Sequence, residues 1–241
     1  MMSENTITTI PILPGGMVNA FLFKTNTGAV LIDTGLPGSE RKVERALAAN
    51  GLGWSDLKLI AVTHGHIDHA GSAKRIRDLS GAPILLHEQD RAYCLGELPL
   101  LKPTGLFGQL FKLTGAIERP FNSFEPDILL TGSAPLDLRP FGLPGHALHT
   151  PGHTPGSLSI LTENGVAFAG DLAASGILLG GLMFRRHPKR PPFEEAVNEV
   201  VASLELLLAR GARAFYVGHG GPLDTDIVRR HLKHLAQLGS D

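Results

Sequence analysis

The stretch that decides the fold is Thr63-His64-Gly65-His66-Ile67-Asp68-His69. It brings four side chains able to bind a metal ion into six consecutive residues. Imidazoles together with a carboxylate are the ligands that a borderline cation such as zinc selects. The spacing allows His64 and His66 to face one ion while Asp68 and His69 face a neighbouring one. The main prediction from this stretch is therefore a metal site.

Three further candidate ligands, His153, Asp171 and His219, lie far along the chain from this stretch. Each follows a short apolar run and stands next to glycine, a pattern typical of a strand end where the chain turns sharply. Because strand ends meet at one edge of a sheet, we expect these residues to converge on the first cluster. Taken singly, each has an ordinary alternative interpretation as a helix cap or a buried hydrogen-bonding group.

The residues between these motifs predict a mixed α/β (α+β) protein. Three strands separated by glycine-rich turns open the chain as an antiparallel meander. Strands are predicted at residues 7–13, 18–24, 29–32, 59–63, 83–86, 129–138, 147–150, 157–162, 166–169 and 213–217. Helices are predicted at 39–50, with Ser39 as the N-cap, and at 69–79, 88–95, 193–209 and 226–238.

The HxHxDH stretch followed by a distant His, Asp and His resembles the metallo-β-lactamase superfamily, and within it the dinuclear hydrolases. The resemblance extends from Asp33-Thr34-Gly35 to His219 and covers nearly the whole chain. It implies a four-layer αβ/βα sandwich forming a single domain over residues 1–241. It also implies that Asp33 lies behind the metal ligands and orients their loop. The implied ligands are His64, His66 and His153 for one metal, Asp68, His69 and His219 for the second, and Asp171 as a bridge.

The chemistry that the resemblance implies is hydrolysis with two divalent metal ions, Zn²⁺ by preference and Fe or Mn as alternatives. A water between two cations loses its proton near neutral pH, so a metal-bridging hydroxide would attack the substrate, with Asp68 and Asp171 as the catalytic carboxylates. The string Pro151-Gly152-His153-Thr154-Pro155-Gly156-Ser157 is similar to the thioesterase branch around glyoxalase II. The leading expectation is therefore cleavage of a thioester, a lactone or a related ester of a small molecule.

Two departures from these relatives leave the substrate open. Glyoxalase II has an additional C-terminal helical region, but only about twenty residues follow His219 here. Lactonases of the superfamily often have a tyrosine soon after the bridging aspartate, and none lies between Asp171 and Tyr216. The alternatives are a mono-iron persulfide dioxygenase-like oxidoreductase, a phosphodiesterase, and a protein whose metals only stabilise its fold. A β-lactamase is disfavoured because the chain shows no export signal.

Two segments are candidates for substrate contact. An apolar series interrupted by prolines and glycines predicts a lid insertion at about residues 96–125, with packing on the outer sheet face or a dimer contact as alternatives. The apolar run 177–184 would form a wall for an acyl chain. The basic run 185–190 would attract a carboxylate or phosphate, or else form a solvated loop. We therefore expect a substrate with an apolar acyl part and an anionic group.

Composition bounds the remaining possibilities. The formal net charge of −1 and the isoelectric point near 6.8 give no global reason to expect a nucleic acid or a membrane as partner, so any such interaction would be local. A single cysteine, Cys94, excludes an internal disulfide and suits a packing role. The beginning of the chain lacks secretory features, which favours a cytoplasmic protein. The remaining histidines are predicted to be surface or packing residues: His87, His146, His149, His187, His231 and His234.

Overall fold

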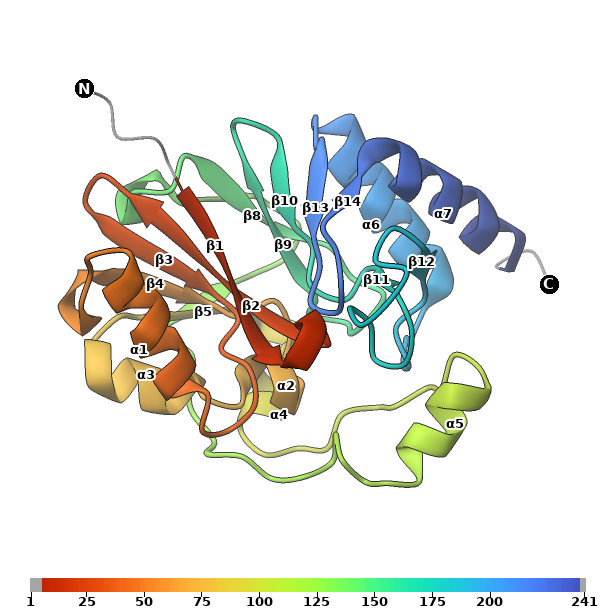
Figure 1. The fold of residues 1–241 in the computed structure, drawn as a ribbon, viewed down its shortest axis with the longest axis horizontal. Coiled ribbons are helices and arrows are strands. Elements are labelled where there is room, and N and C mark those ends of the chain that lie inside the picture. Colours follow the sequence, from red (N-terminus) through yellow and green to blue (C-terminus); the bar gives the residue numbers. More distant parts are fainter. Residues whose placement is uncertain (1–5, 239–241) are drawn as a thin grey trace.

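The computed structural model describes residues 6–238, in which two six-stranded sheets lie face to face with helices outside them (Figure 1). The first sheet has the order β1 (Thr6–Leu13), β2 (Val18–Thr25), β3 (Gly28–Ile32), β4 (Leu57–Ala61), β5 (Ile84–His87) and β6 (Ile128–Leu130). The second has the order β14 (Leu223–Asp224), β13 (Ala214–Tyr216), β10 (Val166–Phe168), β9 (Leu158–Thr162), β8 (Gly145–His149) and β7 (Leu136–Asp137). A small hairpin joins β11 (Ala174–Ser175) to β12 (Pro188–Lys189).

Helices cover the outer face of each sheet (Figure 1). The first half of the chain contains α1 (Glu40–Ala49), α2 (Ile67–Ala70), α3 (Ala73–Ser80), α4 (Arg91–Cys94) and α5 (Leu106–Lys112). The second half contains α6 (Val197–Ala209) and α7 (Thr225–Leu238). Short 3₁₀ turns occupy Pro14–Gly16, Trp54–Asp56, Glu88–Asp90 and Arg139–Phe141. Among residues 6–238, no helix combines the length and the apolarity needed to cross a bilayer.

Three buried apolar clusters show that the architecture has four layers. Alternate side chains of a strand point to opposite faces of its sheet, and β2 shows the consequence. Phe21 and Phe23 join the cluster between the two sheets, whereas Ala20 and Leu22 join the cluster beneath α1 and α3. A third cluster lies between the second sheet and α6 and α7, with Leu204 and Val228 among its members. This arrangement confirms the predicted αβ/βα sandwich.

Most predicted elements are confirmed to within a few residues, including the opening meander and the hairpin between β9 and β10. The prediction of one strand over residues 129–138 is wrong. That segment holds both β6 and β7, which belong to different sheets, and Gly132 has a positive φ of 61° where the chain turns between them. The segment therefore links the two halves of the sandwich.

Two helix predictions also need correction. The helix predicted at 69–79 is divided into α2 and α3 at Gly71, where a Cβ would lie 2.5 Å from the Pro37 ring. Ser39 precedes α1 but makes no side-chain cap; its backbone N–H instead donates to Ser72 Oγ at 3.0 Å. This contact ties the start of α1 to the chain just after the metal motif.

The strand directions bring the predicted site to one edge of the sandwich. In the first sheet β3, β4 and β5 run parallel. In the second sheet β10 runs parallel to β13, and both β10 and β8 run antiparallel to β9. The candidate ligands follow the carboxyl ends of β4, β8, β10 and β13. The segment 96–125, with α5, passes along this same edge in the lower part of Figure 1.

Candidate metal centre

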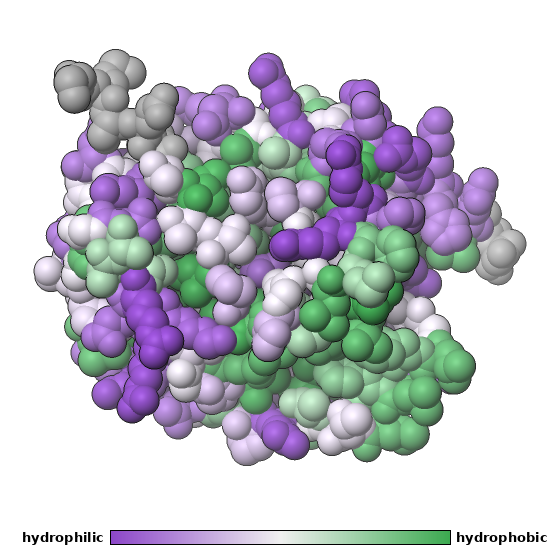
Figure 2. Space-filling model, viewed as in Figure 1, coloured by the Kyte–Doolittle hydropathy of each residue, from purple (hydrophilic) through white to green (hydrophobic). Residues whose placement is uncertain are grey.

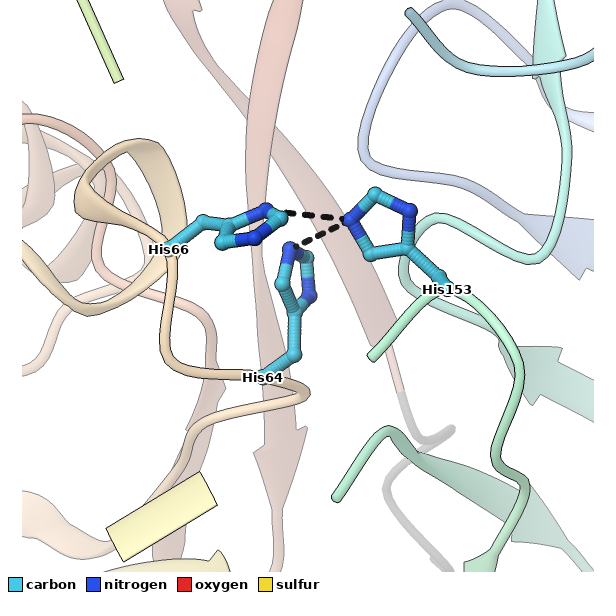
Figure 3. A group of neighbouring side chains, drawn as sticks. All are labelled: His64, His66 and His153. Carbon is cyan, nitrogen blue, oxygen red and sulfur yellow. Dashed lines mark hydrogen bonds between the residues drawn. The ribbon is translucent and has the colours of Figure 1, made fainter. Parts of the chain in front are cut away.

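Three histidines converge at the edge between the two sheets (Figure 3). His64 and His66 come from the loop after β4, and His153 comes from the loop after β8. His153 Nε2 lies 3.1 Å from both His64 Nε2 and His66 Nδ1. All three side chains are buried. Nitrogens bound to one tetrahedral Zn²⁺ at about 2.0–2.1 Å would be roughly 3.3 Å apart, so this geometry fits a single ion.

A second group lies beside the first and consists of Asp68, His69 and His219. Asp68 Oδ2 lies 3.4 Å from His219 Nε2 and 3.9 Å from His69 Nε2. Asp171 faces both groups, because its Oδ2 is 3.0 Å from His219 Nε2 and 3.7 Å from His153 Nε2. Its Oδ1 is 3.5 Å from His69 Nε2. Its Oδ2 therefore faces one member of each group, while its Oδ1 faces His69 of the second group.

The side chains close enough to hold one ion form three overlapping groups within residues 6–238. Together these groups contain the seven residues predicted from the sequence and no other His, Cys, Asp or Glu of the described chain: His64, His66, Asp68, His69, His153, Asp171 and His219. Four of their atoms are buried without any hydrogen-bond partner in the described residues: His66 Nε2, His153 Nδ1, His69 Nε2 and Asp171 Oδ1. The last two, His69 Nε2 and Asp171 Oδ1, lie 3.5 Å apart between the ligand groups. A buried polar atom without a partner is costly, so these atoms fit a bound cation.

The protonation states of three of these ligands, His66, His153 and Asp171, also suit metal binding. Burial lowers the pKa of both His66 and His153 to about 3, so both rings are neutral at pH 7. Burial alone would raise the pKa of Asp171, but the charges of His219 and His69 outweigh it and hold that pKa below its ordinary value. Neutral imidazole and ionised carboxylate are the forms that bind a metal.

Asp33 lies behind two of the candidate ligands, as the resemblance implies. It accepts the backbone N–H of Thr63 at 2.7 Å and the Thr63 hydroxyl at 2.9 Å. His69 donates its Nδ1–H to Asp33 Oδ2 at 2.8 Å, and the Nδ1 of His64 lies 3.1 Å from the Thr63 oxygen. Because the Nδ1 atoms are engaged in this way, both rings present Nε2 toward the centre.

The Asp33 contact also sets the charge of His69 in the metal-free protein. Burial lowers the pKa of His69, but the charges of Asp33, Asp171 and Asp68 outweigh it and raise the pKa to about 10. His69 is therefore protonated at neutral pH, and a cation must displace that proton in order to bind. This links metal loading to release of a proton.

The His219 loop is fastened by a residue that sequence reasoning missed. Buried Asn19 donates its side-chain N–H groups to the carbonyls of Gly16 and Gly220 at 3.2 and 3.1 Å, while His219 donates Nδ1–H to the Met17 carbonyl. At Gly218, a Cβ would lie 2.4 Å from Asp171 Oδ1, so glycine is required for the close approach of the backbone. Asn19 gave no sequence signal, because two of its three side-chain partners, Val217 and Gly220, come from the other end of the chain.

Asp90 is the second residue that sequence reasoning missed. It is fully buried at the end of the 3₁₀ turn after β5 and accepts three hydrogen bonds. Its donors are the Gly65 N–H at 2.8 Å, the Thr154 hydroxyl at 2.8 Å and the Gly156 N–H at 2.7 Å. Gly65 separates two candidate ligands, and the other two donors follow His153 within three residues. Asp90 therefore clamps together the two loops that form the first group of histidines.

The remaining histidines lie outside the centre, as predicted. His87 and His149 stack with their ring centres 3.7 Å apart, and His149 donates its Nε2–H to the Pro155 carbonyl at 2.8 Å. His231 is buried in α7, and His187 is exposed. Cys94 is buried in the first apolar cluster, which confirms its packing role.

Apolar side chains border a small cavity at the centre itself. Five of the candidate ligands line it: His66, Asp68, His153, Asp171 and His219. Phe111 and Ile117 from the 96–125 segment line it too, together with Leu179 and Phe193. The rings of Phe111 and Phe193 stack at 5.8 Å. The predicted lid segment thus contributes directly to the wall of the cavity.

Comparisons with known proteins agree with this geometry. The family model of the metallo-β-lactamase superfamily matches residues 13–219. A probable metallo-hydrolase of Bacillus subtilis, YflN, is 30% identical over 86% of this chain and 81% of its own length. The hydroxyacylglutathione hydrolase GloC of Haemophilus influenzae is 28% identical over 83% of this chain and 84% of its own length. The crystal structure of the B3 metallo-β-lactamase BLEG-1 has a TM-score of 0.70 and 25% identity, covering 95% of this chain and 99% of that one.

Proposed function

This chain belongs to the metallo-β-lactamase superfamily, and from that premise we propose that it is a dinuclear metal-dependent hydrolase of small thioesters, lactones or related esters. The observation that carries the proposal is the meeting of seven buried ligand-type side chains in three overlapping groups at one sheet edge. A general role in hydrolysis is supported by similarity to a probable metallo-hydrolase and to a hydroxyacylglutathione hydrolase.

The residues of the centre form two groups of ligands and one bridging residue. His64, His66 and His153 would hold one cation, Asp68, His69 and His219 the other, and Asp171 would face both. Two divalent cations, with Zn²⁺ preferred over Fe or Mn, would ionise a shared water near neutral pH and polarise the substrate carbonyl. His69 and His219 each donate Nδ1–H to an oxygen behind them, which fixes the orientation of both imidazole rings.

Asp68 is the carboxylate best placed to move a proton. Its side chain retains 10% exposure, compared with 4% for Asp171, and Asp68 lines the small cavity at the centre. Its Oδ atoms would accept the proton released during attack and return it to the leaving thiolate or alkoxide. Asp171 would hold the two groups of ligands together.

The cavity wall supports an acyl substrate. Phe111, Ile117, Leu179 and Phe193 provide apolar surface next to the candidate ligands. Lys189 lines a separate groove with Phe107, and its ammonium lies 5.9 Å from the centre of the Phe107 ring. An apolar acyl part would lie on the wall, and an anionic group of the substrate would face the cationic side chains. Similarity to GloC favours a thioester as the bond that is cleaved.

A substrate panel with metal analysis tests the proposal. The protein, purified without added metal, is assayed on thioesters, lactones, phosphodiesters and a β-lactam, and its zinc, iron and manganese contents are measured. The proposal expects hydrolysis of a thioester or lactone that is lost in a His153→Ala variant. A His146→Ala variant is the matched control, because His146 lies on β8 outside the centre.

Several results of the panel would overturn the proposal. One iron per chain with oxygen consumption on a persulfide would identify an oxidoreductase. Cleavage of phosphodiesters alone would identify a phosphodiesterase. Turnover of the β-lactam alone would identify a β-lactamase, the activity named for the similar structure BLEG-1. A full complement of metal without turnover of any substrate would indicate metals that only stabilise the fold.

A further inference from the structure

Exposed apolar side chains are concentrated around the mouth of the metal centre. Of sixteen exposed large apolar residues in the described chain, eleven lie in only two segments. They are Leu98, Leu100, Leu106, Phe107, Leu110 and Leu113 in the first segment and Ile177, Leu178, Leu182, Met183 and Phe184 in the second. Leu113 is 84% exposed and Leu106 is 72% exposed. We call residues 98–113 and 177–190 together the collar. A continuous apolar patch of this kind marks an interaction surface.

The two segments of the collar form one surface. Thr104 donates its hydroxyl to the Pro191 carbonyl just beyond the second segment, and Lys189 of the second segment lies over the Phe107 ring of the first. Residues 104–108 line one groove together with Leu178 and residues 188–190. Figure 2 shows a hydrophobic area at the lower right of the molecule, where Figure 1 places α5. Phe111 and Leu179 connect this surface to the metal cavity.

The charge of the collar differs from that of the chain as a whole. The chain has 22 Lys and Arg against 23 Asp and Glu, whereas residues 98–113 and 177–190 contain six Lys and Arg and no acidic residue. Outside partners neutralise two of the cations, since Arg186 pairs with Asp224 at 2.9 Å and Arg190 with Glu194 at 2.7 Å. The other four form no ion pair with any acidic side chain of residues 6–238: Lys102, Lys112, Arg185 and Lys189.

We propose that the collar docks the protein onto an anionic lipid bilayer. Leucine and phenylalanine side chains among four lysine and arginine side chains that form no ion pair match the acyl boundary and the phosphate headgroups of such a surface. A two-fold contact between copies through this face would bring the two sets of cations together, which disfavours a second copy as the occupant. The net charge of the whole chain gives no reason to expect a membrane partner, and the collar is the local exception.

Docking in this orientation would turn the mouth of the metal centre toward the bilayer. If the proposed function holds, acyl substrates would reach the centre from the lipid surface. The docking itself needs no hydrolysis, so a failure to bind vesicles and a failure to hydrolyse esters are separate results.

Sedimentation with lipid vesicles tests the collar directly. The protein as purified is mixed with vesicles of phosphatidylcholine alone or with an equal share of phosphatidylglycerol, at low and high salt. Binding to the anionic vesicles that weakens with salt is expected. Lys112→Glu changes the collar by two charges and should reduce partitioning about 25-fold, at about fivefold per charge. Leu113→Ser should also reduce binding while leaving the melting temperature unchanged.

Matched controls lie on the opposite side of the sandwich. Arg45→Glu, on the exposed face of α1, changes the net charge as much as Lys112→Glu does. Leu79→Ser, in α3, removes an exposed leucine outside the collar. Both should bind anionic vesicles as the unmodified protein does. The proposal is overturned if the collar variants and the controls bind equally, or if no anionic vesicle is bound. It is also overturned if light scattering finds a dimer that Leu113→Ser separates.

Discussion

The loops of the metal centre and the collar lie side by side but are built in opposite ways. His64 and His69 have no exposed surface, and their rings are fixed by Thr63 and Asp33. In the collar, Leu106 and Leu113 are mostly exposed. The groups that would do chemistry are therefore positioned before any substrate arrives, and the groups that would meet a surface are left in water. Changes in the first region should affect metal binding and stability, and changes in the second should affect neither.

The largest effect is expected from Asp171→Asn, which keeps the shape of the side chain but removes the charge that faces both groups. We expect loss of at least one metal ion per chain and a fall in hydrolysis of about 10³-fold or more, since metal ions supply several kcal/mol of transition-state stabilisation. Elemental analysis and the rate on the best ester measure both effects. His146→Ala should change neither. An Asp171→Asn protein with its full metal content and rate would contradict the assigned centre.

The next effect is expected from Asp90→Asn. An amide presents an N–H group where the carboxylate now accepts, so at least one of the donors Gly65 N–H, Thr154 hydroxyl or Gly156 N–H loses its partner. One buried donor without a partner costs about 1–3 kcal/mol of unfolding free energy. Zinc affinity should fall about 10–100-fold, as it does when the groups behind metal ligands are removed.

Urea unfolding and a competition titration with a zinc chelator measure these two changes. Asp78→Asn is the control, because Asp78 is an exposed carboxylate paired only with Lys74 and should alter stability by less than about 0.5 kcal/mol. If Asp90→Asn destabilises the fold and leaves zinc affinity intact, Asp90 does not position the ligands.

His231 is a buried histidine outside the metal centre, and its titration should affect the acid stability of the fold. Burial, with smaller contributions from His234 and Arg190, lowers the pKa of His231 to about 4. The unfolded chain, with a pKa near 6.5, binds this proton first on acidification, so the contribution to stability is complete above pH 6.5 and is lost as the pH falls toward 4. The unfolding free energy should fall by up to about 1.4 kcal/mol per pH unit in this window.

Replacing His231 by leucine should flatten that part of the pH profile. The measurement is urea unfolding at several pH values for the variant and the unmodified protein. His146→Leu should retain the original slope. An equal slope in the His231→Leu protein would show that this residue does not set the acid limit of the fold.

The smallest effect on stability is expected in the collar. Leu113→Ser should shift the unfolding free energy by less than about 0.5 kcal/mol, because the side chain is already in water. Leu207→Ala, in the cluster beneath α6, should cost about 2–5 kcal/mol. Urea unfolding of the two variants gives the contrast. A large loss in Leu113→Ser would mean that the collar is part of the core.

The sequence is informative about the first region because residue type and spacing are enough to identify metal ligands. The motif residues 64–69 and the isolated His153, Asp171 and His219 could be identified without coordinates. Asp90 and Asn19 could not, because both act on backbone groups whose positions depend on the finished fold. The two-sheet division of residues 129–138 was missed for a related reason: two short apolar runs resemble one long strand until the partner strands are known.

The collar was harder still to interpret from the sequence. An apolar series broken by proline and glycine is compatible with a lid, a packed insertion or an interface, and only the exposure of each side chain separates these. The structure places Phe111 and Ile117 at the metal cavity and leaves Leu110 and Leu113 outside it. The same segment therefore has an inner face directed at the centre and an outer face directed at solvent.

The central claim is that seven side chains from both halves of the chain hold a pair of cations. Elemental analysis of protein purified without added metal, compared with the His153→Ala and His219→Ala variants, tests it most directly. We expect close to two equivalents of divalent metal per chain, and a loss of one or both ions in each variant. Trace metal in the unmodified protein after incubation with Zn²⁺, Fe²⁺ and Mn²⁺, or full occupancy in both variants, would contradict it.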